Sequence, residues 1–303
     1  MVKLSVSLSG VTLDNPVIPC SGTFGFGYEF ADCYDINILG AISIKGTTCQ
    51  PRYGNATPRI AECTGGLLNA VGLQNPGVDK VIAEELPKLR QVYHKPVIAN
   101  ISGFSIDEYV SCCEKMSESD DVDLIERNIS CPNVHNGGMA FGTSPESAAQ
   151  VTAAVKKVCR KPLYVKLSPN VTDMAAIAKA CEAAGADGLS LINTLLGMRI
   201  DLAKRKPLLA NTTGGLSGPA VFPVAVRMVW QVYNAVKIPI IGMGGISSWQ
   251  DAAELMLAGA TAVAVGAMNF HDPYLTEKVA DGLEDYASRH GLDSISQLTG
   301  AVQ

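Results

Sequence analysis

The chain has 303 residues, of which 47% are hydrophobic and 17% are charged, and its formal net charge is −5. This length fits one large barrel of alternating strands and helices, so we expect a single domain over residues 1–303. The negative net charge argues against nucleic-acid binding, which would need a basic face. No run of about 18 apolar residues occurs, so no membrane span is expected.

The cysteines and histidines carry no metal-binding pattern. Nine cysteines are scattered without a Cys-x-x-Cys pair, and four histidines lie far apart. We therefore expect no metal on this chain and no iron–sulfur cluster of its own. An odd number of scattered thiols is typical of a reducing cytosol, and no apolar segment follows Lys3 as in a signal peptide. We expect a cytoplasmic protein.

Short apolar runs alternate with helical patterns along the whole chain. Residues 4–8 and 11–13 predict a hairpin, which we place as a plug at the bottom of a barrel. Strands are predicted at 17–20, 41–45, 96–100, 124–129, 162–166, 188–192, 238–242 and 261–265. Helices are predicted at 29–34, 78–93, 105–116, 144–158, 174–184, 220–233, 249–257 and 274–289, with Ser105, Ser144 and Thr172 as N-caps and Gly185 as a stop.

Eight strands that are each followed by a helix predict a parallel sheet closed into a (β/α)8 TIM barrel. Two long polar loops, at 47–77 and 195–219, are expected over its C-terminal face. Loops of this length in a compact protein are usually functional. A doubly wound sheet would usually carry G-x-G-x-x-G after its first strand, and this fingerprint follows none of the strands.

The fourth strand leads into Asn128-Ile-Ser-Cys-Pro-Asn133. Alternation places Glu126, Asn128 and Ser130 on one face, and Pro132 ends regular pairing. Cys131 thus leaves the strand at the working end of a barrel, and residues 131–143 are a candidate lid. A buried structural cysteine is the alternative interpretation.

Other strand ends carry residues suited to binding an anion. Lys45 and Lys166 leave different strands toward one mouth, which indicates an anionic or electron-rich ligand. Glycines follow the last two strands and precede the helix after residue 219, a pattern that binds phosphate through bare backbone N–H groups. Tight turns would explain each glycine alone. A flavin mononucleotide, FMN, joins a phosphate to a planar ring and fits both features. The whole set of strand-end residues is Ser21, Lys45, Asn100, Asn128, Lys166, Asn193, Thr194, Gly244, Gly245 and Gly266.

Distinctive motifs lie at 45–47, 52–55, 58–59, 69–77, 128–133, 192–194 and 214–219. Together they resemble the dihydroorotate dehydrogenase family. Cysteine at position 131 resembles the class 1 enzymes, and Val-His-Asn-Gly-Gly at 134–138 resembles class 1B. The resemblance implies oxidation of (S)-dihydroorotate to orotate in de novo pyrimidine biosynthesis. It also implies electron transfer to NAD⁺ through a partner subunit with FAD and a [2Fe–2S] cluster, in a heterotetramer built on a dimer of this chain.

The resemblance also implies roles for individual residues. Cys131 is the expected general base, and Lys45 is expected to stabilise negative charge. The expected substrate-binding residues are Lys45, Asn69, Ala70, Val71, Gly72, Leu73, Asn128, Asn133, Asn193 and Thr194. The expected FMN-binding residues are Ser21, Lys45, Gly46, Asn100, Asn128, Lys166, Ile192, Gly218, Gly244, Gly245, Gly266 and Ala267.

Two positions depart from the family pattern. Arg127 stands where the family usually has an apolar residue, and alternation turns it toward the covering helices. A charge buried there is costly unless it is paired or reaches water. Ala267 replaces a common threonine, which keeps the backbone N–H but loses a hydroxyl donor.

Alternative functions remain open at this point. The first is a fumarate-dependent class 1A dihydroorotate dehydrogenase. Another is a flavin barrel that acts on a dihydropyrimidine or on dihydrouridine, although RNA would favour a basic surface. The third is a cofactor-free barrel that binds a sugar phosphate, as an isomerase or as a sensor.

Overall fold

The structure is a computed structural model that describes residues 2–129 and 141–302. Eight parallel strands form one sheet in the order β3-β16-β15-β10-β9-β8-β7-β4. Its two end strands meet where the Gly40 N–H donates to the carbonyl of Val17 at 3.0 Å. The sheet is therefore a nearly closed barrel, and the predicted (β/α)8 fold is confirmed. The strands are β3 (Val17–Pro19), β4 (Ile42–Thr47), β7 (Val97–Ile101), β8 (Leu124–Asn128), β9 (Leu163–Lys166), β10 (Gly188–Leu191), β15 (Ile240–Met243) and β16 (Ala262–Val265).

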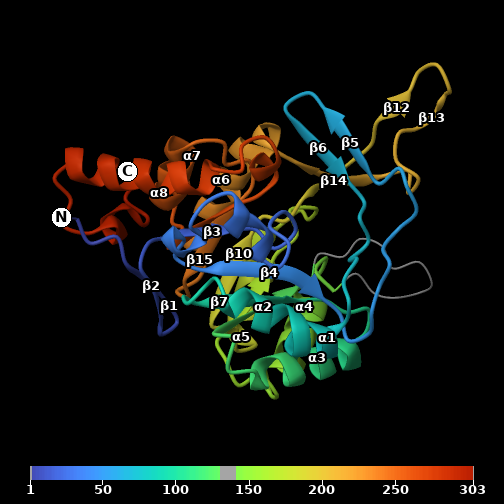
Figure 1. The fold of residues 1–303 in the computed structure, drawn as a ribbon, viewed down its shortest axis with the longest axis horizontal. Helices are drawn as coiled ribbons and strands as arrows, with labels where there is room; N and C mark the ends of the chain where they lie inside the picture. The colour runs from blue at the N-terminus through green and yellow to red at the C-terminus, as the bar shows by residue number, and fades with distance from the viewer. Residues whose placement is uncertain (1, 130–140, 303) are drawn as a thin grey trace.

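Helices surround the barrel (Figure 1). They are α1 (Val78–Lys80), α2 (Leu86–Arg90), α3 (Ile106–Glu118), α4 (Pro145–Lys156), α5 (Met174–Ala183), α6 (Phe222–Tyr233), α7 (Trp249–Leu257) and α8 (Leu275–Arg289). The predicted helix at 78–93 contains a π-helical stretch, η3 (Val81–Glu85), between α1 and α2. After β3 the chain forms only the short 3₁₀ segments η1 (Tyr28–Asp32) and η2 (Ile36–Ile38). Within 2–129 and 141–302, no helix is both long and apolar enough to span a bilayer.

The N-terminal hairpin lies where the sequence predicted it. Strand β1 (Val6–Leu8) pairs antiparallel with β2 (Val11–Leu13). In the turn, the Ser9 hydroxyl donates to the carbonyl of Asp187 at 2.7 Å and lies 3.1 Å from the Tyr164 hydroxyl. Asp187 directly precedes β10, so these contacts place the hairpin at the N-terminal end of the barrel.

Two predicted helix caps are confirmed and one is wrong. The side chains of Ser105 and Ser144 accept hydrogen bonds from the third residue that follows each of them. The cap of α5 is Asp173, which accepts from the Ala176 N–H, and not Thr172. Asp173 directly precedes the first helical residue, so its carboxylate reaches the exposed N–H groups of the first turn.

The sequence predicted two long polar loops, at 47–77 and 195–219, but both segments contain strands. They form a four-stranded antiparallel sheet in the order β11-β14-β6-β5, which projects from the barrel in Figure 1. Leu68 of β6 pairs with Leu216 of β14, so the partners come from opposite halves of the chain. Short glycine-containing strands give little local signal. The strands are β5 (Ile60–Cys63), β6 (Gly66–Asn69), β11 (Leu195–Gly197) and β14 (Gly214–Ser217), with a further hairpin of β12 (Ile200–Asp201) and β13 (Lys206–Pro207).

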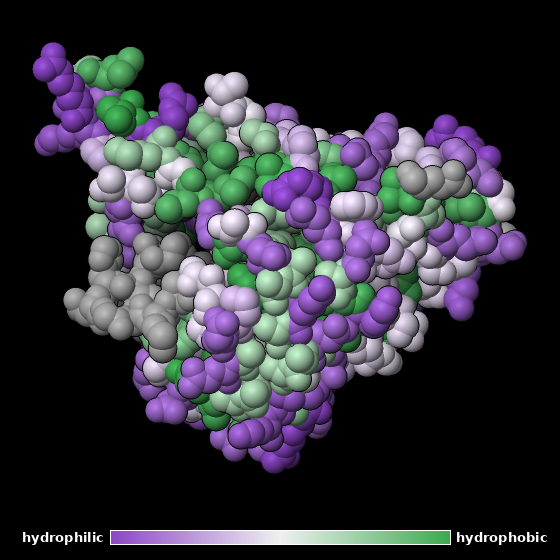
Figure 2. Space-filling view, turned by 180° about the vertical axis from the view of Figure 1, so that it is seen from behind, coloured by the Kyte–Doolittle hydropathy of each residue, from purple (hydrophilic) through white to green (hydrophobic). Residues whose placement is uncertain are grey.

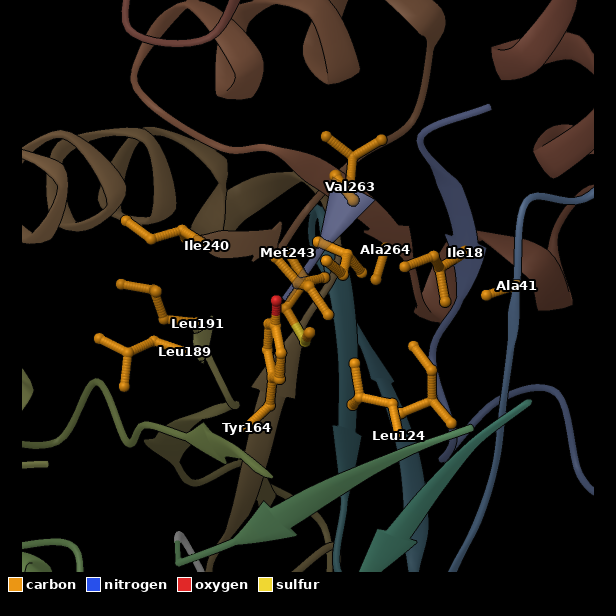
Figure 3. Packing of buried hydrophobic residues seen from close by; sticks show 14 of the residues in the cluster. Ile18, Ala41, Leu124, Tyr164, Leu189, Leu191, Ile240, Met243, Val263 and Ala264 are labelled. Carbon is orange, nitrogen blue, oxygen red and sulfur yellow. The ribbon is translucent and has the colours of Figure 1, made fainter. Parts of the chain in front are cut away.

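Buried side chains fill both faces of the barrel wall, as Figure 3 shows. Strand register and alternation direct Ile18, Leu124 and Tyr164 to the barrel interior, and all three are buried. Leu189 and Val263 face the surrounding helices instead. The apolar interior ends below the C-terminal strand ends, where polar residues replace it.

Candidate active site

A cavity opens at the C-terminal ends of the barrel strands and continues beneath the four-stranded sheet. Predicted site residues from both long segments and from most barrel strands meet there. Those that line it are Ser21, Lys45, Gly46, Asn69, Ala70, Val71, Gly72, Leu73, Asn100, Asn128, Lys166, Ile192, Asn193, Thr194, Gly218, Gly244, Gly245, Gly266 and Ala267. The other two predicted residues, Cys131 and Asn133, lie outside the described part of the chain.

Asparagine side chains are held in fixed orientations at the mouth. The Asn193 Nδ2 donates to Asn128 Oδ1 at 3.1 Å, and Asn193 Oδ1 accepts from the Thr194 N–H at 2.7 Å. Asn69 Nδ2 donates to the carbonyl of Gly215 at 3.4 Å, which links β6 to β14. Because an amide has both donors and acceptors, this group suits a planar ligand with alternating N–H and C=O groups.

Lys45 lines the cavity and has a second cation, Arg59, in its neighbourhood. Burial lowers the pKa of Lys45, and the nearby Arg59 guanidinium lowers it further. Arg59 is held by the carbonyls of Tyr53 and Asn55 and by the side chain of Gln74. A positive potential from two neighbouring cations favours a ligand that carries a negative charge.

A buried polar cluster lies at the floor of the cavity. Glu126 Oε2 accepts from Asn100 Nδ2 at 2.5 Å and lies 3.6 Å from Lys166 Nζ. Cys20 is beside this cluster, with its thiol 3.4 Å from the carbonyl of Ala264. Burial raises the pKa of Cys20 to about 11, with opposing effects from the charges of Lys166 and Glu126. At neutral pH this thiol is therefore protonated.

Glycine backbone forms another part of the cavity wall. Gly244 and Gly245 follow β15 with φ of 122° and 84°, values that L side chains rarely adopt. A Cβ on Gly245 would lie 2.8 Å from the backbone nitrogen of Phe222, so a larger residue would displace the start of α6. Together with Gly266 and Ala267 after β16, this backbone can approach an anion closely. These features fit the phosphate of a flavin, and the amides and lysines fit its ring.

Sequence reasoning missed one part of the cavity wall. Gly22, Thr23, Met243 and Met268 line it from the barrel, and other residues line it from the four-stranded sheet. The sheet contributes Ile60, Leu67, Leu196, Gly214, Gly215, Leu216 and Ser217. The motifs at 69–77 and 214–219 signalled this region, but its apolar residues lie in segments without periodicity and so gave no signal of their own.

Comparison with known proteins identifies the family. The family model described as dihydroorotate dehydrogenase matches residues 3–286. The chain belongs to the dihydroorotate dehydrogenase family. It is 57% identical over 300 residues to the catalytic subunit of dihydroorotate dehydrogenase B (NAD(+)) of Enterococcus faecalis, with 99% of this chain and 96% of that protein covered.

Two further relatives carry the same description. The protein of Parabacteroides distasonis is 57% identical over 302 residues, with 100% of this chain and 99% of the relative covered. That of Geobacillus kaustophilus is 56% identical over 300 residues, with 99% and 96% covered. The likeness thus extends over the barrel and over both segments that form the four-stranded sheet.

Proposed function

We propose that this chain oxidises (S)-dihydroorotate to orotate in de novo pyrimidine biosynthesis, in the cytoplasm, as a catalytic subunit whose electrons continue to NAD⁺ through a partner. One observation carries the proposal. In a chain of this family, a single cavity joins a glycine backbone cradle to a region of fixed asparagines and two lysines, Lys45 and Lys166. A flavin with a small anionic pyrimidine over its ring fits that arrangement.

FMN is the proposed cofactor. Backbone N–H groups at Gly244, Gly245, Gly266 and Ala267, with Gly218, would hold its phosphate. Its ring would lie over the strand ends, held by Ser21, Lys45, Gly46, Asn100, Asn128, Lys166 and Ile192. When bound, FMN supplies the acceptor for the hydride that leaves C6 of dihydroorotate.

Fixed amides orient the substrate in this proposal. Asn69, Asn128, Asn193 and Thr194 would bind the N–H and C=O groups of the pyrimidine, and the backbone of 70–73 would cover it. Because Asn193 is itself held by Asn128 and by Thr194, it contributes orientation at little entropic cost. Lys45, with Arg59 nearby, would bind the substrate carboxylate. Asn133 is proposed for substrate binding from the resemblance alone.

Cys131 is the proposed general base, which removes the proton from C5 of dihydroorotate. It follows Asn128, a residue at the cavity, by three positions. In the variant Cys131→Ser, flavin reduction by dihydroorotate should slow about 10²–10⁴-fold. Binding of FMN and of orotate should persist. An unchanged rate of reduction would remove Cys131 from the mechanism.

The proposed electron route leaves the chain through another subunit. The relatives are described as catalytic subunits of an NAD(+) enzyme, which supports a separate partner subunit. FAD and a [2Fe–2S] cluster on that partner, and assembly into a heterotetramer, are proposed from the family resemblance alone. The chain alone, once reduced, should hardly be reoxidised by NAD⁺, and addition of the partner should restore NAD⁺ reduction. Rapid reoxidation by fumarate would favour the class 1A alternative instead.

The substrate assignment is tested by comparing two ligands that differ in one group. Orotate and uracil share the pyrimidine ring, but only orotate has the carboxylate. Binding to the FMN-loaded chain is followed by the change in flavin absorbance. Orotate should bind at least about tenfold more tightly, because a hydrogen bond to a charged group contributes about 1.5–3 kcal/mol. Equal affinities would favour the dihydropyrimidine alternative.

A further inference from the structure

We propose that Glu126 is a positioning residue of the flavin site, which orients Asn100 and Lys166 and limits how strongly the site stabilises reduced flavin. The inference rests on the proposed function, since it takes FMN as the ligand of the cavity. Asn100 and Lys166 line the cavity, whereas Glu126 lies beneath them and is not part of its wall. Glu126 therefore acts through its two neighbours.

The barrel register brings these three side chains together. Asn100 on β7 pairs with Glu126 on β8, and Lys166 on β9 pairs with Asn128, two residues further along β8. Paired residues of neighbouring strands point to the same face, here the barrel interior. Glu126 is thus enclosed between the two strands whose side chains it contacts, and only 2% of its surface is exposed.

The contact with Asn100 fixes which end of the amide is presented to the ligand. Its Nδ2 is directed to the Glu126 carboxylate at 2.5 Å. Its Oδ1 faces the backbone of Gly46, where an added Cβ would lie 2.9 Å from it. Gly46 itself lines the cavity. Glu126 therefore selects the amide orientation in which the acceptor oxygen of Asn100 lies toward Gly46 at the cavity wall.

The contact with Lys166 concerns charge. The ammonium and the carboxylate are 3.6 Å apart, and their side chains are 9% and 3% exposed. At such burial solvent screens little of the interaction, so the carboxylate reduces the positive potential that Lys166 adds to the cavity. Reduced flavin carries more negative charge than oxidised flavin. Removal of the Glu126 charge should therefore favour the reduced form.

The test compares Glu126→Gln with Glu85→Gln in the FMN-loaded chain, using redox titration of bound flavin and FMN dissociation constants. Glutamine keeps an acceptor for Asn100 but loses the charge. Glu126→Gln should raise the affinity for reduced relative to oxidised FMN about tenfold, a shift of about 30 mV to more positive potential for a two-electron couple. Glu85 is a matched control, because it is also buried and paired, with Tyr28 and Lys88, away from the cavity.

A second variant covers the possibility that Glu126→Gln does not fold. Glu126→Asp keeps the charge but withdraws the carboxylate, so it should leave the potential near the wild-type value and weaken FMN binding in both redox states. An unchanged flavin potential in a folded, FMN-loaded Glu126→Gln variant would overturn this inference but leave the proposed function standing. Wild-type FMN affinity together with wild-type potential in Glu126→Asp would also overturn this inference only. A wild-type chain that binds no FMN would overturn the proposed function as well.

Discussion

Arg127 Nη2 donates a hydrogen bond of 2.7 Å to Thr152 Oγ1, and this contact joins β8 to α4 inside the protein. The Arg127 side chain is completely buried, with its guanidinium 5.8 Å from the ring centre of Tyr109. Its Nε and Nη1 have no hydrogen-bond partner in the described part of the chain. Burial lowers the pKa of Arg127. The contact with α4 confirms that the Arg127 side chain points toward the helices, as strand alternation predicted.

Replacement of Arg127 by leucine should raise the melting temperature. The substitution removes a buried charge that makes one side-chain hydrogen bond within residues 2–129 and 141–302. Replacement of buried ion pairs by apolar residues is often neutral or stabilises by about 1–4 kcal/mol, and we expect the same direction here. The measurement is thermal unfolding of wild type and Arg127→Leu. A matched variant, Thr152→Val, should have the opposite effect, because it keeps the charge and removes its acceptor. A lower melting temperature in Arg127→Leu would show that the hydrogen bond and ring contact outweigh the cost of burial.

Lys45→Met should stabilise the ligand-free chain and weaken orotate binding. Burial lowers the pKa of Lys45 in the fold from its ordinary value of 10.5, so the folded chain binds this proton less tightly than the unfolded chain. The charged lysine therefore destabilises the fold below its folded-state pKa, and this cost disappears as pH rises toward 10.5. Orotate affinity should fall roughly 10–100-fold.

The measurement is melting temperature without ligand together with orotate titration at pH 7. Lys95→Met is the control, because Lys95 pairs with Asp14 away from the cavity. The Lys95→Met variant should change neither the melting temperature nor the orotate affinity appreciably. If Lys45→Met bound orotate like the wild type, the carboxylate would be held elsewhere.

Alkylation should distinguish Cys20 from an exposed thiol. The pKa of Cys20 is raised to about 11 by burial, and only the thiolate reacts. Brief treatment with iodoacetamide at pH 8, followed by peptide mass spectrometry, should label the exposed Cys33 well before Cys20. Labelling of Cys20 should increase as pH approaches 11. Equal labelling of Cys20 and Cys33 at pH 8 would contradict the raised pKa of Cys20.

The observed N-cap of α5, Asp173, and the cap expected from sequence, Thr172, together allow a stability test with an internal control. Asp173→Ala should lower the free energy of unfolding by about 1 kcal/mol, since it removes the acceptor for the Ala176 N–H. Thr172→Ala should have a much smaller effect. Denaturant unfolding measures both, and a larger loss in Thr172→Ala would restore the cap expected from sequence.

Local signals were enough to predict the barrel. Runs such as Val97–Ile101 and Ala262–Val265 are apolar and short, and the helices between them begin at recognisable caps. The alternation of side chains along a strand also predicted correctly that Arg127 points outward, toward the helices. Cap position, by contrast, depends on a single residue, and threonine at 172 and aspartate at 173 are both acceptable cap types.

Contacts between distant segments were not predictable in this way. The pairing of Leu68 with Leu216 joins strands that contain glycine and lack clear alternation. Glu126 was placed on the same face as Asn128, but its contacts with Asn100 and Lys166 depend on the register of three strands. The exposure of the apolar side chains of Ile200 and Leu202, on the hairpin of β12 and β13, was also not predictable from local pattern. Figure 2 shows that the surface carries hydrophobic as well as hydrophilic residues.

The most direct test of the proposed function is a single anaerobic turnover. The FMN-loaded chain is mixed with dihydroorotate without oxygen, NAD⁺ or partner, while flavin absorbance and orotate are measured together. Loss of the oxidised flavin band with one orotate formed per flavin is the expected result. A flavin that stays oxidised with no orotate formed, in a chain that binds both FMN and orotate, would contradict the account.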